Sequence, residues 1–118
     1  MNILIAEDDE ISAMVLSKAL KDYTQSLYHA TTGPKVIEIF SQHPDIDLIL
    51  LDVNLPEMNG YEVASRIRKT NQEIKIFAQT AYSISSEKHI ALEAGCNEFI
   101  SKPIKRADLI ALIQKYFK

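Results

Sequence analysis

The sequence predicts an α/β fold in which a five-stranded parallel sheet is doubly wound, with five helices covering both of its faces. At 118 residues, of which 47% are hydrophobic, the chain has the size and composition of one compact domain spanning residues 1–118. Short apolar stretches alternate five times with segments whose apolar residues recur every three or four positions, as strands alternate with helices. Strict alternation implies parallel strands joined by right-handed crossovers.

The first half of the chain contains two strand–helix pairs. A strand at residues 2–6 precedes a helix at residues 10–21, whose expected inner face consists of Ile11, Val15, Leu16 and Leu20. The second strand, residues 26–30, is less apolar and is therefore expected at a sheet edge. Gly33 and Pro34 then open a helix that carries Val36, Ile37 and Phe40, because proline suits a first helical position.

Three further pairs complete the alternation. The third strand ends at Asp52, and a helix follows at residues 61–69 with Val63, Ala64 and Ile67 inward. The fourth strand covers residues 74–79, and its helix, residues 85–94, stops at Gly95, which suits a left-handed cap. The fifth strand covers residues 98–101, and the last helix, residues 106–116, presents Leu109, Ile110, Leu112 and Ile113 at helical spacing.

Polar side chains occupy the carboxyl ends of four of these apolar strands. They are Glu7 and Asp8 after the first strand, Asp52 at the third, Thr80 after the fourth and Lys102 after the fifth. In doubly wound sheets the functional crevice lies beyond the carboxyl ends of the strands. We therefore expect these five side chains to meet at one edge of the sheet.

Such a cluster can bind a hard cation and transfer a phosphoryl group. Crowded carboxylates repel one another and need a compensating cation, and oxygen donors favour Mg²⁺. We expect Asp8 and Asp52 as direct ligands, Glu7 acting through a water, and the backbone carbonyl of Asn54 as a further ligand. The absence of His and Cys near these strand ends argues against zinc.

The same carboxylates include a candidate nucleophile. Asp52 can attack phosphorus and form an aspartyl phosphate. The metal, the Lys102 ammonium and the Thr80 hydroxyl would each bind one of the three equatorial oxygens of the phosphoryl group.

Each residue also has an ordinary structural interpretation. Asp9 and Glu10 suit the start of a helix, and a capping role for Glu7 and Asp8 is equally open. Taken alone, Asp52 could stabilise a turn, Thr80 could be a strand-end hydroxyl and Lys102 a solvated lysine. The coincidence of four strand-end placements favours the common site.

Composition restricts the other classes of function. Thirteen basic and sixteen acidic residues leave a formal charge of −3 without a basic patch, so no nucleic-acid partner is expected. The single Cys96 cannot form an internal disulfide, which favours a reducing cytoplasmic setting. No apolar run is long enough to span a bilayer, so we expect a soluble domain without membrane contact.

The chain resembles the receiver domain of two-component response regulators over essentially its whole length. The strongest match is residues 51–60, Leu-Asp-Val-Asn-Leu-Pro-Glu-Met-Asn-Gly, which follows the pattern Asp-x-x-Leu/Met-Pro-x-Met-Asp/Asn-Gly. Residues 3–9 match the acidic start, residues 78–81 the switch hydroxyl and its small neighbour, and residues 99–103 the lysine-proline strand end.

The resemblance implies a flavodoxin-like sheet in the order 2-1-3-4-5 and a role for each site residue. Asp52 is the implied phosphoryl acceptor, Glu7 and Asp8 form the Mg²⁺ pocket, and Thr80 and Lys102 grip the phosphoryl group. A cis peptide between Lys102 and Pro103 is also implied, and Phe99 occupies the aromatic switch position, although it equally suits a core aromatic.

The resemblance also implies how the domain signals. A phosphohistidine on a sensor histidine kinase or histidine phosphotransfer domain would donate to Asp52, and the face built from the fourth helix, fifth strand and fifth helix would change. The domain would be a switch whose chemistry is limited to its own phosphorylation and dephosphorylation, and the sequence leaves open whether phosphorylation drives a homodimer. Residues 78–83 look most like receivers joined to hybrid sensor kinases, so we expect a receiver from a larger kinase or a stand-alone relay protein.

Three alternative functions compete with this interpretation. A phosphohydrolase of the haloacid-dehalogenase type would use Asp-x-Asp, whereas position 54 is Asn. A flavodoxin-like cofactor domain would need a Ser/Thr/Gly-rich loop after the first strand, where this chain has residues 7–10, Glu-Asp-Asp-Glu. A receiver that signals by docking alone would not need the full set of active-site residue types.

Tyr82 yields a prediction about the lifetime of the phosphorylated state. Asn54 and Tyr82 lie two residues beyond Asp52 and Thr80, at positions that in this family influence hydrolysis of the acyl phosphate. Tyr82 is bulky enough to hinder an attacking water, so the native phosphoprotein should decay more slowly than a Tyr82→Ala variant. Loss of the phosphoryl mass with time measures both rates, and equal rates would refute the prediction.

Overall fold

Five strands alternate with the helices of the chain, and the computed structural model describes residues 1–81 and 85–117. The strands are β1 (Asn2–Ala6), β2 (Ser26–Ala30), β3 (Leu48–Asp52), β4 (Lys75–Thr80) and β5 (Glu98–Ser101). All neighbouring strands pair in parallel in the order β2-β1-β3-β4-β5, which confirms the predicted fold class and places β2 at an edge.

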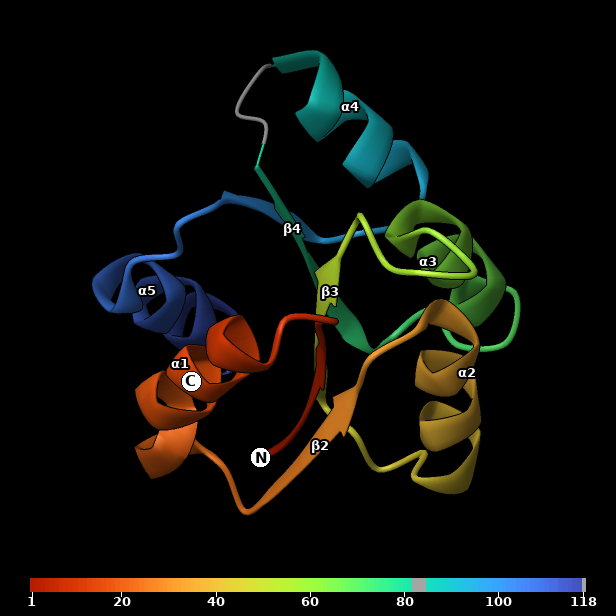
Figure 1. Ribbon diagram of the computed structural model, residues 1–118. Coiled ribbons are helices and arrows are strands. Elements are labelled where there is room, and N and C mark those ends of the chain that lie inside the picture. The colour runs from red at the N-terminus through yellow and green to blue at the C-terminus, as the bar shows by residue number, and fades with distance from the viewer. Residues whose placement is uncertain (82–84, 118) are drawn as a thin grey trace.

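The helices follow the strands in turn and form a layer on each side of the sheet. They are α1 (Glu10–Leu20), the short 3-10 helix η1 (Lys21–Tyr23), α2 (Gly33–Gln42), α3 (Gly60–Arg68), α4 (Ser85–Glu93) and α5 (Arg106–Tyr116). Figure 1 shows α1 and α5 on one face of the sheet and α2 and α3 on the other, with α4 above α3. Within the described part of the chain, no helix has the length and apolar character needed to cross a membrane.

Two apolar cores lie between these layers. One packs sheet residues against α2, α3 and α4, and the other packs them against α1 and α5. Every residue of β3 is buried, because the central strand is covered on both faces. Successive residues of β4 belong to opposite cores, so Ile76 faces α2 and α3 while Phe77 faces α1 and α5.

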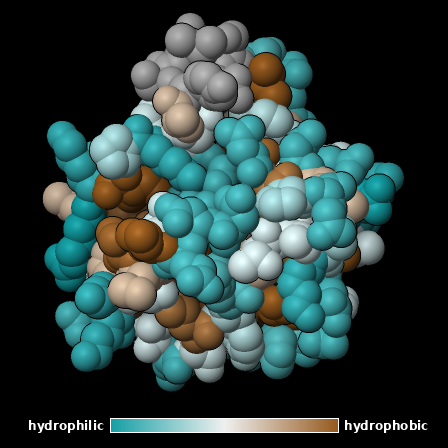
Figure 2. Space-filling view, viewed as in Figure 1, coloured by the Kyte–Doolittle hydropathy of each residue, from teal (hydrophilic) through white to brown (hydrophobic). Residues whose placement is uncertain are grey.

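The predicted inner face of α1 was partly wrong. Ile11 and Val15 are 71% and 57% exposed, and Met14 beside them is also exposed. The helix instead buries Ala13, Leu16 and Leu20. Small Ala13 thus lies on the side of the helix that meets the sheet, and Ile11 and Val15 lie on a neighbouring stripe. In Figure 2, hydrophobic surface gathers on the side of the molecule formed by α1 and α5.

The ends of the elements agree with the local chemistry. The Asp9 side chain caps α1 by accepting a hydrogen bond from the Ile11 N–H, as expected of an acidic residue in that position. Gly95 has a φ of 104°, which confirms the left-handed conformation after α4. The Lys102–Pro103 peptide is cis, as the resemblance implied. Thr80 is the last residue of β4, so this strand ends one residue later than predicted. Tyr82 lies outside the described residues.

Gly60 fixes the path of the chain after β3. Its N–H donates a hydrogen bond of 3.0 Å to the Val53 carbonyl oxygen, so the loop folds back against the strand. A Cβ atom at this position would lie 2.5 Å from the Asp52 carbonyl oxygen and 2.8 Å from the Val53 Cα. Only glycine therefore fits against the backbone that carries Asp52.

A Gly60→Ala variant should consequently be destabilised. The added methyl group meets backbone atoms that cannot rotate away, and overpacking of this kind costs about 2 kcal/mol. Urea unfolding of the two proteins measures the difference. A Ser65→Ala variant on the exposed side of the same helix is the control and should change stability little. Gly60→Ala stability equal to that of the control would contradict the prediction.

Candidate functional site

The sheet brings the predicted site residues to one edge. Asp52 is paired with Gln79 on β4, and Thr80 is paired with Ser101 on β5, so the carboxyl ends of these strands are aligned. β1 lies on the other side of β3 and ends at Ala6, directly before Glu7 and Asp8. Order and register together therefore place residues from four strand ends around β3.

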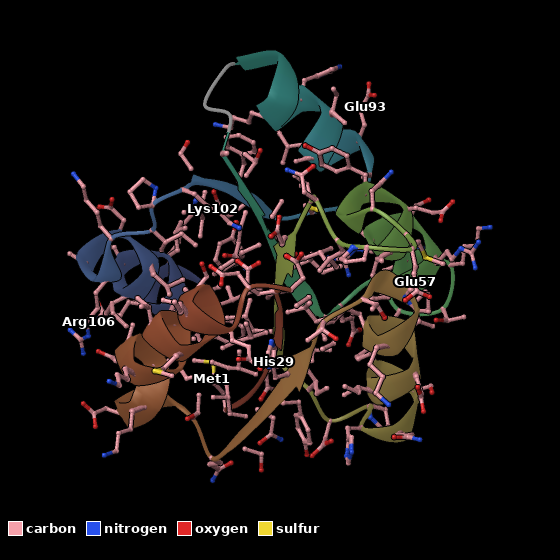
Figure 3. All side chains as sticks on the ribbon, viewed as in Figure 1. Met1, His29, Glu57, Glu93, Lys102 and Arg106 are labelled. Carbon is pink, nitrogen blue, oxygen red and sulfur yellow. The ribbon has the colours of Figure 1, made fainter. Side chains whose placement is uncertain are left out.

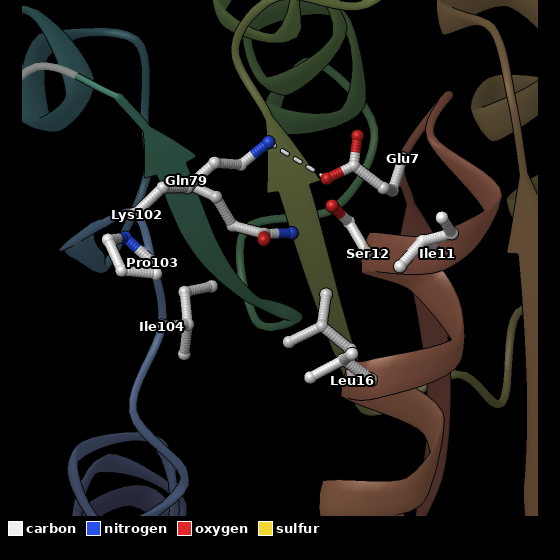
Figure 4. A pocket seen from close by; sticks show the side chains of 9 residues that line it. Glu7, Ile11, Ser12, Leu16, Gln79, Lys102, Pro103 and Ile104 are labelled. Carbon is white, nitrogen blue, oxygen red and sulfur yellow. Dashed lines mark hydrogen bonds and ion pairs between the residues drawn. The ribbon is translucent and has the colours of Figure 1, made fainter.

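Lys102 joins two buried carboxylates at this edge. Its Nζ donates hydrogen bonds of 2.8 Å to Glu7 Oε1 and of 2.8 Å to Asp52 Oδ2. Glu7 and Asp52 are only 1% and 3% exposed, whereas the Lys102 side chain is partly exposed. Figure 3 shows Lys102 projecting from the segment after β5 toward the end of β3, and Figure 4 marks its ion pair with Glu7.

The backbone holds all three of these groups in place. The Asn54 N–H donates to Asp52 Oδ1 at 2.9 Å, and the Asp9 N–H donates to Glu7 Oε2 at 3.4 Å. The Lys102 N–H donates to the Thr80 carbonyl oxygen at 2.7 Å, which ties the lysine to the end of β4. Each carboxylate thus contacts both the ammonium and a backbone donor.

Burial and proximity shift the acidity of the two carboxyl groups in opposite directions. Burial, together with the neighbouring Asp52, raises the pKa of Glu7 to about 7, against the opposing effect of Lys102. Burial acts to raise the pKa of Asp52 as well, but hydrogen bonds from Glu7, Lys102 and the Asn54 N–H hold it below its ordinary value. The pKa of Lys102 is raised because its contacts with Asp52 and Glu7 outweigh the effect of burial. Asp52 therefore stays ionised near neutral pH. The neighbouring Glu7, whose pKa is raised, is protonated in part of the molecules at that pH.

The three carboxylates suit a hard divalent cation. One oxygen each from Glu7, Asp8 and Asp52 can be chosen so that all three lie within 4.8 Å of one another. When all are ionised they carry three negative charges against the one positive charge of Lys102. The set contains only oxygen donors, and Asp8 is exposed, so hydrated Mg²⁺ fits it better than zinc.

The remaining predicted site residues lie close to this cluster in the fold. Thr80 is fully buried at the end of β4, and Asn54 is exposed on the loop after Asp52. Phe99 is half-buried on β5 opposite Ala78, where it packs against the core on the α2 and α3 side. The core interpretation of Phe99 therefore holds, and its role as a switch stays a prediction.

One buried polar residue next to the site was not singled out in the sequence. Gln79 is fully buried on β4, adjacent to Thr80 and paired with Asp52 in the strand register. Its only signal in the sequence is an amide within an otherwise apolar run.

Comparisons with known proteins agree with this geometry. The family model of the response regulator receiver domain matches residues 3–114. The "Hybrid signal transduction histidine kinase M" of Dictyostelium discoideum is 36% identical over 119 residues, a match that covers 96% of this chain and 5% of that protein. The chain therefore spans only a small fraction of the curated relative's length.

Solved structures show the same fold. One is the co-crystal structure of the Saccharomyces cerevisiae histidine phosphotransfer signaling protein Ypd1 and the receiver domain of its downstream response regulator Ssk1. This match has a TM-score of 0.90 and 28% identity, and it covers 98% of this chain and 88% of that chain. Another is a CheY-like response regulator receiver domain protein from Methanospirillum hungatei, with a TM-score of 0.85 and 25% identity over 97% and 90% of the two chains. The family model covers all but the first two and last four residues of the chain. The chain therefore belongs to the response regulator receiver domains, the signalling switches of two-component systems.

Proposed function

We propose that Asp52 accepts a phosphoryl group from a phosphohistidine on a sensor histidine kinase or a histidine phosphotransfer domain, and that the reaction requires Mg²⁺. The observation that carries this proposal is the Lys102 ammonium, which lies 2.8 Å from both Asp52 and Glu7 at the carboxyl edge of the sheet. An ionised carboxylate beside a fixed ammonium and an acidic cation site is arranged for attack on phosphorus.

The chemistry needs few groups from the protein. A carboxylate oxygen of Asp52 forms the bond to phosphorus while the phosphorus–nitrogen bond of the donor breaks, and the imidazole keeps the electron pair. Lys102 then moves its positive charge from the carboxylate to a phosphoryl oxygen, and the Thr80 hydroxyl donates to another. When bound by Glu7, Asp8, Asp52 and the Asn54 carbonyl, Mg²⁺ would offset negative charge on the incoming phosphoryl group.

The same contacts suggest how the phosphoryl group changes the domain. Thr80 and Lys102 are joined by a backbone hydrogen bond of 2.7 Å, so a phosphoryl group bound by both side chains pulls on the ends of β4 and β5 together. Phe99 lies on β5 three residues before Lys102 and is only half-buried, so an inward movement would bury more of its ring. The α4, β5 and α5 face would then change and report the modification to a partner.

The relatives support the choice of partner and setting. Hybrid histidine kinases and a receiver crystallised with a histidine phosphotransfer protein are similar to this chain. We infer a cytoplasmic domain that exchanges a phosphoryl group with a protein of this kind and that contacts neither nucleic acid nor membrane itself. The domain would act as a switch, with no substrate other than its own phosphoryl group.

Phosphorylation should be confined to Asp52 and should depend on Mg²⁺. Incubation with Mg²⁺ and acetyl phosphate should add the mass of one phosphoryl group to the native protein, because a small donor supplies the same electrophile as phosphohistidine. Intact-mass spectrometry measures the adduct. An Asp52→Asn variant preserves the shape of the side chain and removes the nucleophile, so it should gain no mass. An adduct of equal yield on this variant, or in the presence of a chelator, would contradict the proposal.

Removing the Lys102 ammonium should strengthen the binding of Mg²⁺ and slow the phosphorylation of the domain. A Lys102→Met variant removes one positive charge next to three carboxylates, so its affinity for Mg²⁺ should rise by roughly tenfold. Its phosphorylation by acetyl phosphate should slow, because a phosphoryl oxygen loses its partner. Chemical-shift titration measures the first effect and intact mass the second.

The matched control for this experiment is Lys105→Met, which removes an exposed lysine three residues further along the chain. This variant should behave like the native protein in both measurements. Weaker binding of Mg²⁺ by Lys102→Met than by the control would show that the lysine does not compete with the cation for Glu7 and Asp52.

A further inference from the structure

Gln79 is a fully buried amide whose side chain has no hydrogen-bond partner among the described residues. The Gln79 residue is 0% exposed, and neither its Oε1 nor its Nε2 has a hydrogen-bond partner within residues 1–81 and 85–117. Burying an amide without hydrogen bonds is costly, and native proteins rarely leave both ends of one group unpaired. A polar partner from outside the chain would remove that cost.

The buried Gln79 side chain is among those that line a cavity between α1 and the segment that follows β5. The cavity has a volume of about 400 Å³. Its apolar wall is formed by Ile11, Val15, Leu16, Pro103 and Ile104. Figure 4 shows the Gln79 amide reaching from β4 toward α1, with Ile104 and Leu16 to one side of it. The stripe of α1 that was wrongly predicted to face the core therefore lines this cavity instead.

The polar groups at the mouth of the cavity are already engaged with one another. Glu7 and Lys102 form an ion pair of 2.8 Å, so their charges largely offset each other. The Ser12 hydroxyl donates to Asp9 Oδ2 at 2.7 Å. A charged ligand would have to break the ion pair, whereas a neutral ligand can enter beside it.

We propose that this cavity binds a small neutral molecule that carries a carboxamide or lactam group and a compact branched aliphatic body. Such a group presents one donor and one acceptor side by side, which matches the two unpaired atoms of Gln79 with a parallel pair of hydrogen bonds. The aliphatic body covers Ile11, Val15 and Ile104. The volume lies within the range of small-molecule sites, which are mostly apolar with a few fixed polar groups.

A ligand suits this position better than solvent does. A buried water is held by two to four polar partners, whereas the wall around the Gln79 amide is largely aliphatic. A carboxamide satisfies both amide atoms and buries its own apolar part against the same wall. The cavity adjoins the proposed phosphoryl site through Glu7 and Lys102, but it does not include Asp52, and its test makes no use of phosphorylation.

The probe for the binding experiment is isovaleramide, and its control is methyl isobutyl ketone, which has nearly the same shape and no N–H donor. Isovaleramide should shift the Gln79 side-chain amide signal and the backbone amides of α1 in ¹⁵N spectra, with saturation in the millimolar range expected of so small a fragment. The ketone should bind several-fold more weakly, because it offers no donor to Gln79 Oε1.

The variant that tests the role of the amide is Gln79→Met, which keeps the length of the side chain and removes both polar atoms. It should weaken isovaleramide binding by about tenfold, the effect of losing a pair of neutral hydrogen bonds. Gln72→Met, at an exposed glutamine, is the matched control and should leave binding unchanged. Equal affinity of the native protein and Gln79→Met, or no saturable shift at Gln79, would overturn the proposal.

Thermal unfolding without any probe provides a second, independent readout. If the Gln79 amide has no partner in the free protein, Gln79→Met should raise the melting temperature by about 3 to 6 °C, while Gln72→Met leaves it unchanged. A lower melting temperature for Gln79→Met would show that solvent already satisfies the amide and would contradict the proposal.

Discussion

The ion pair of Lys102 with Glu7 and Asp52 is the interaction on which the arrangement of the site depends. Two carboxylates that are both almost fully buried repel each other, and the isolated pair would be unstable in so dry a position. The ammonium offsets part of this repulsion, and it comes from the segment after the last strand of the sheet. The site therefore forms only when the first, third and fifth strands are assembled in the observed order.

The fold could be predicted from the sequence because the strands are covered on both faces. A strand such as β3 is then a continuous apolar run, and the first polar residue after it marks the edge of the sheet. Parallel pairing brings all such residues to the same edge, so a common edge for Glu7, Asp52 and Lys102 followed from the alternation. The strand order that places them close together along that edge followed from the resemblance. The cis peptide before Pro103 followed from the resemblance and not from the residues themselves.

Two features of the structure could not be obtained in the same way. Apolar residues on two adjacent stripes of α1 gave no unique inner face, and the sheet contacts the stripe that contains small Ala13. The sequence also gave no sign that the Gln79 amide lacks a partner, because satisfaction of a buried group depends on side chains from distant segments. Both features concern how α1 packs beside the sheet, a geometry that periodicity does not determine.

The two features also have a common physical consequence. Phe77, two residues before Gln79, faces the same side of the sheet and is fully enclosed by the core under α1 and α5. Gln79 is also fully buried, and it lines a cavity whose apolar wall includes the α1 side chains Ile11 and Val15. At the carboxyl edge beside this cavity, Lys102 is partly exposed while Glu7 and Asp52 stay buried. A lysine in that position can exchange one anionic partner for another without unfolding any element, which is the movement that the proposed phosphorylation of Asp52 would require.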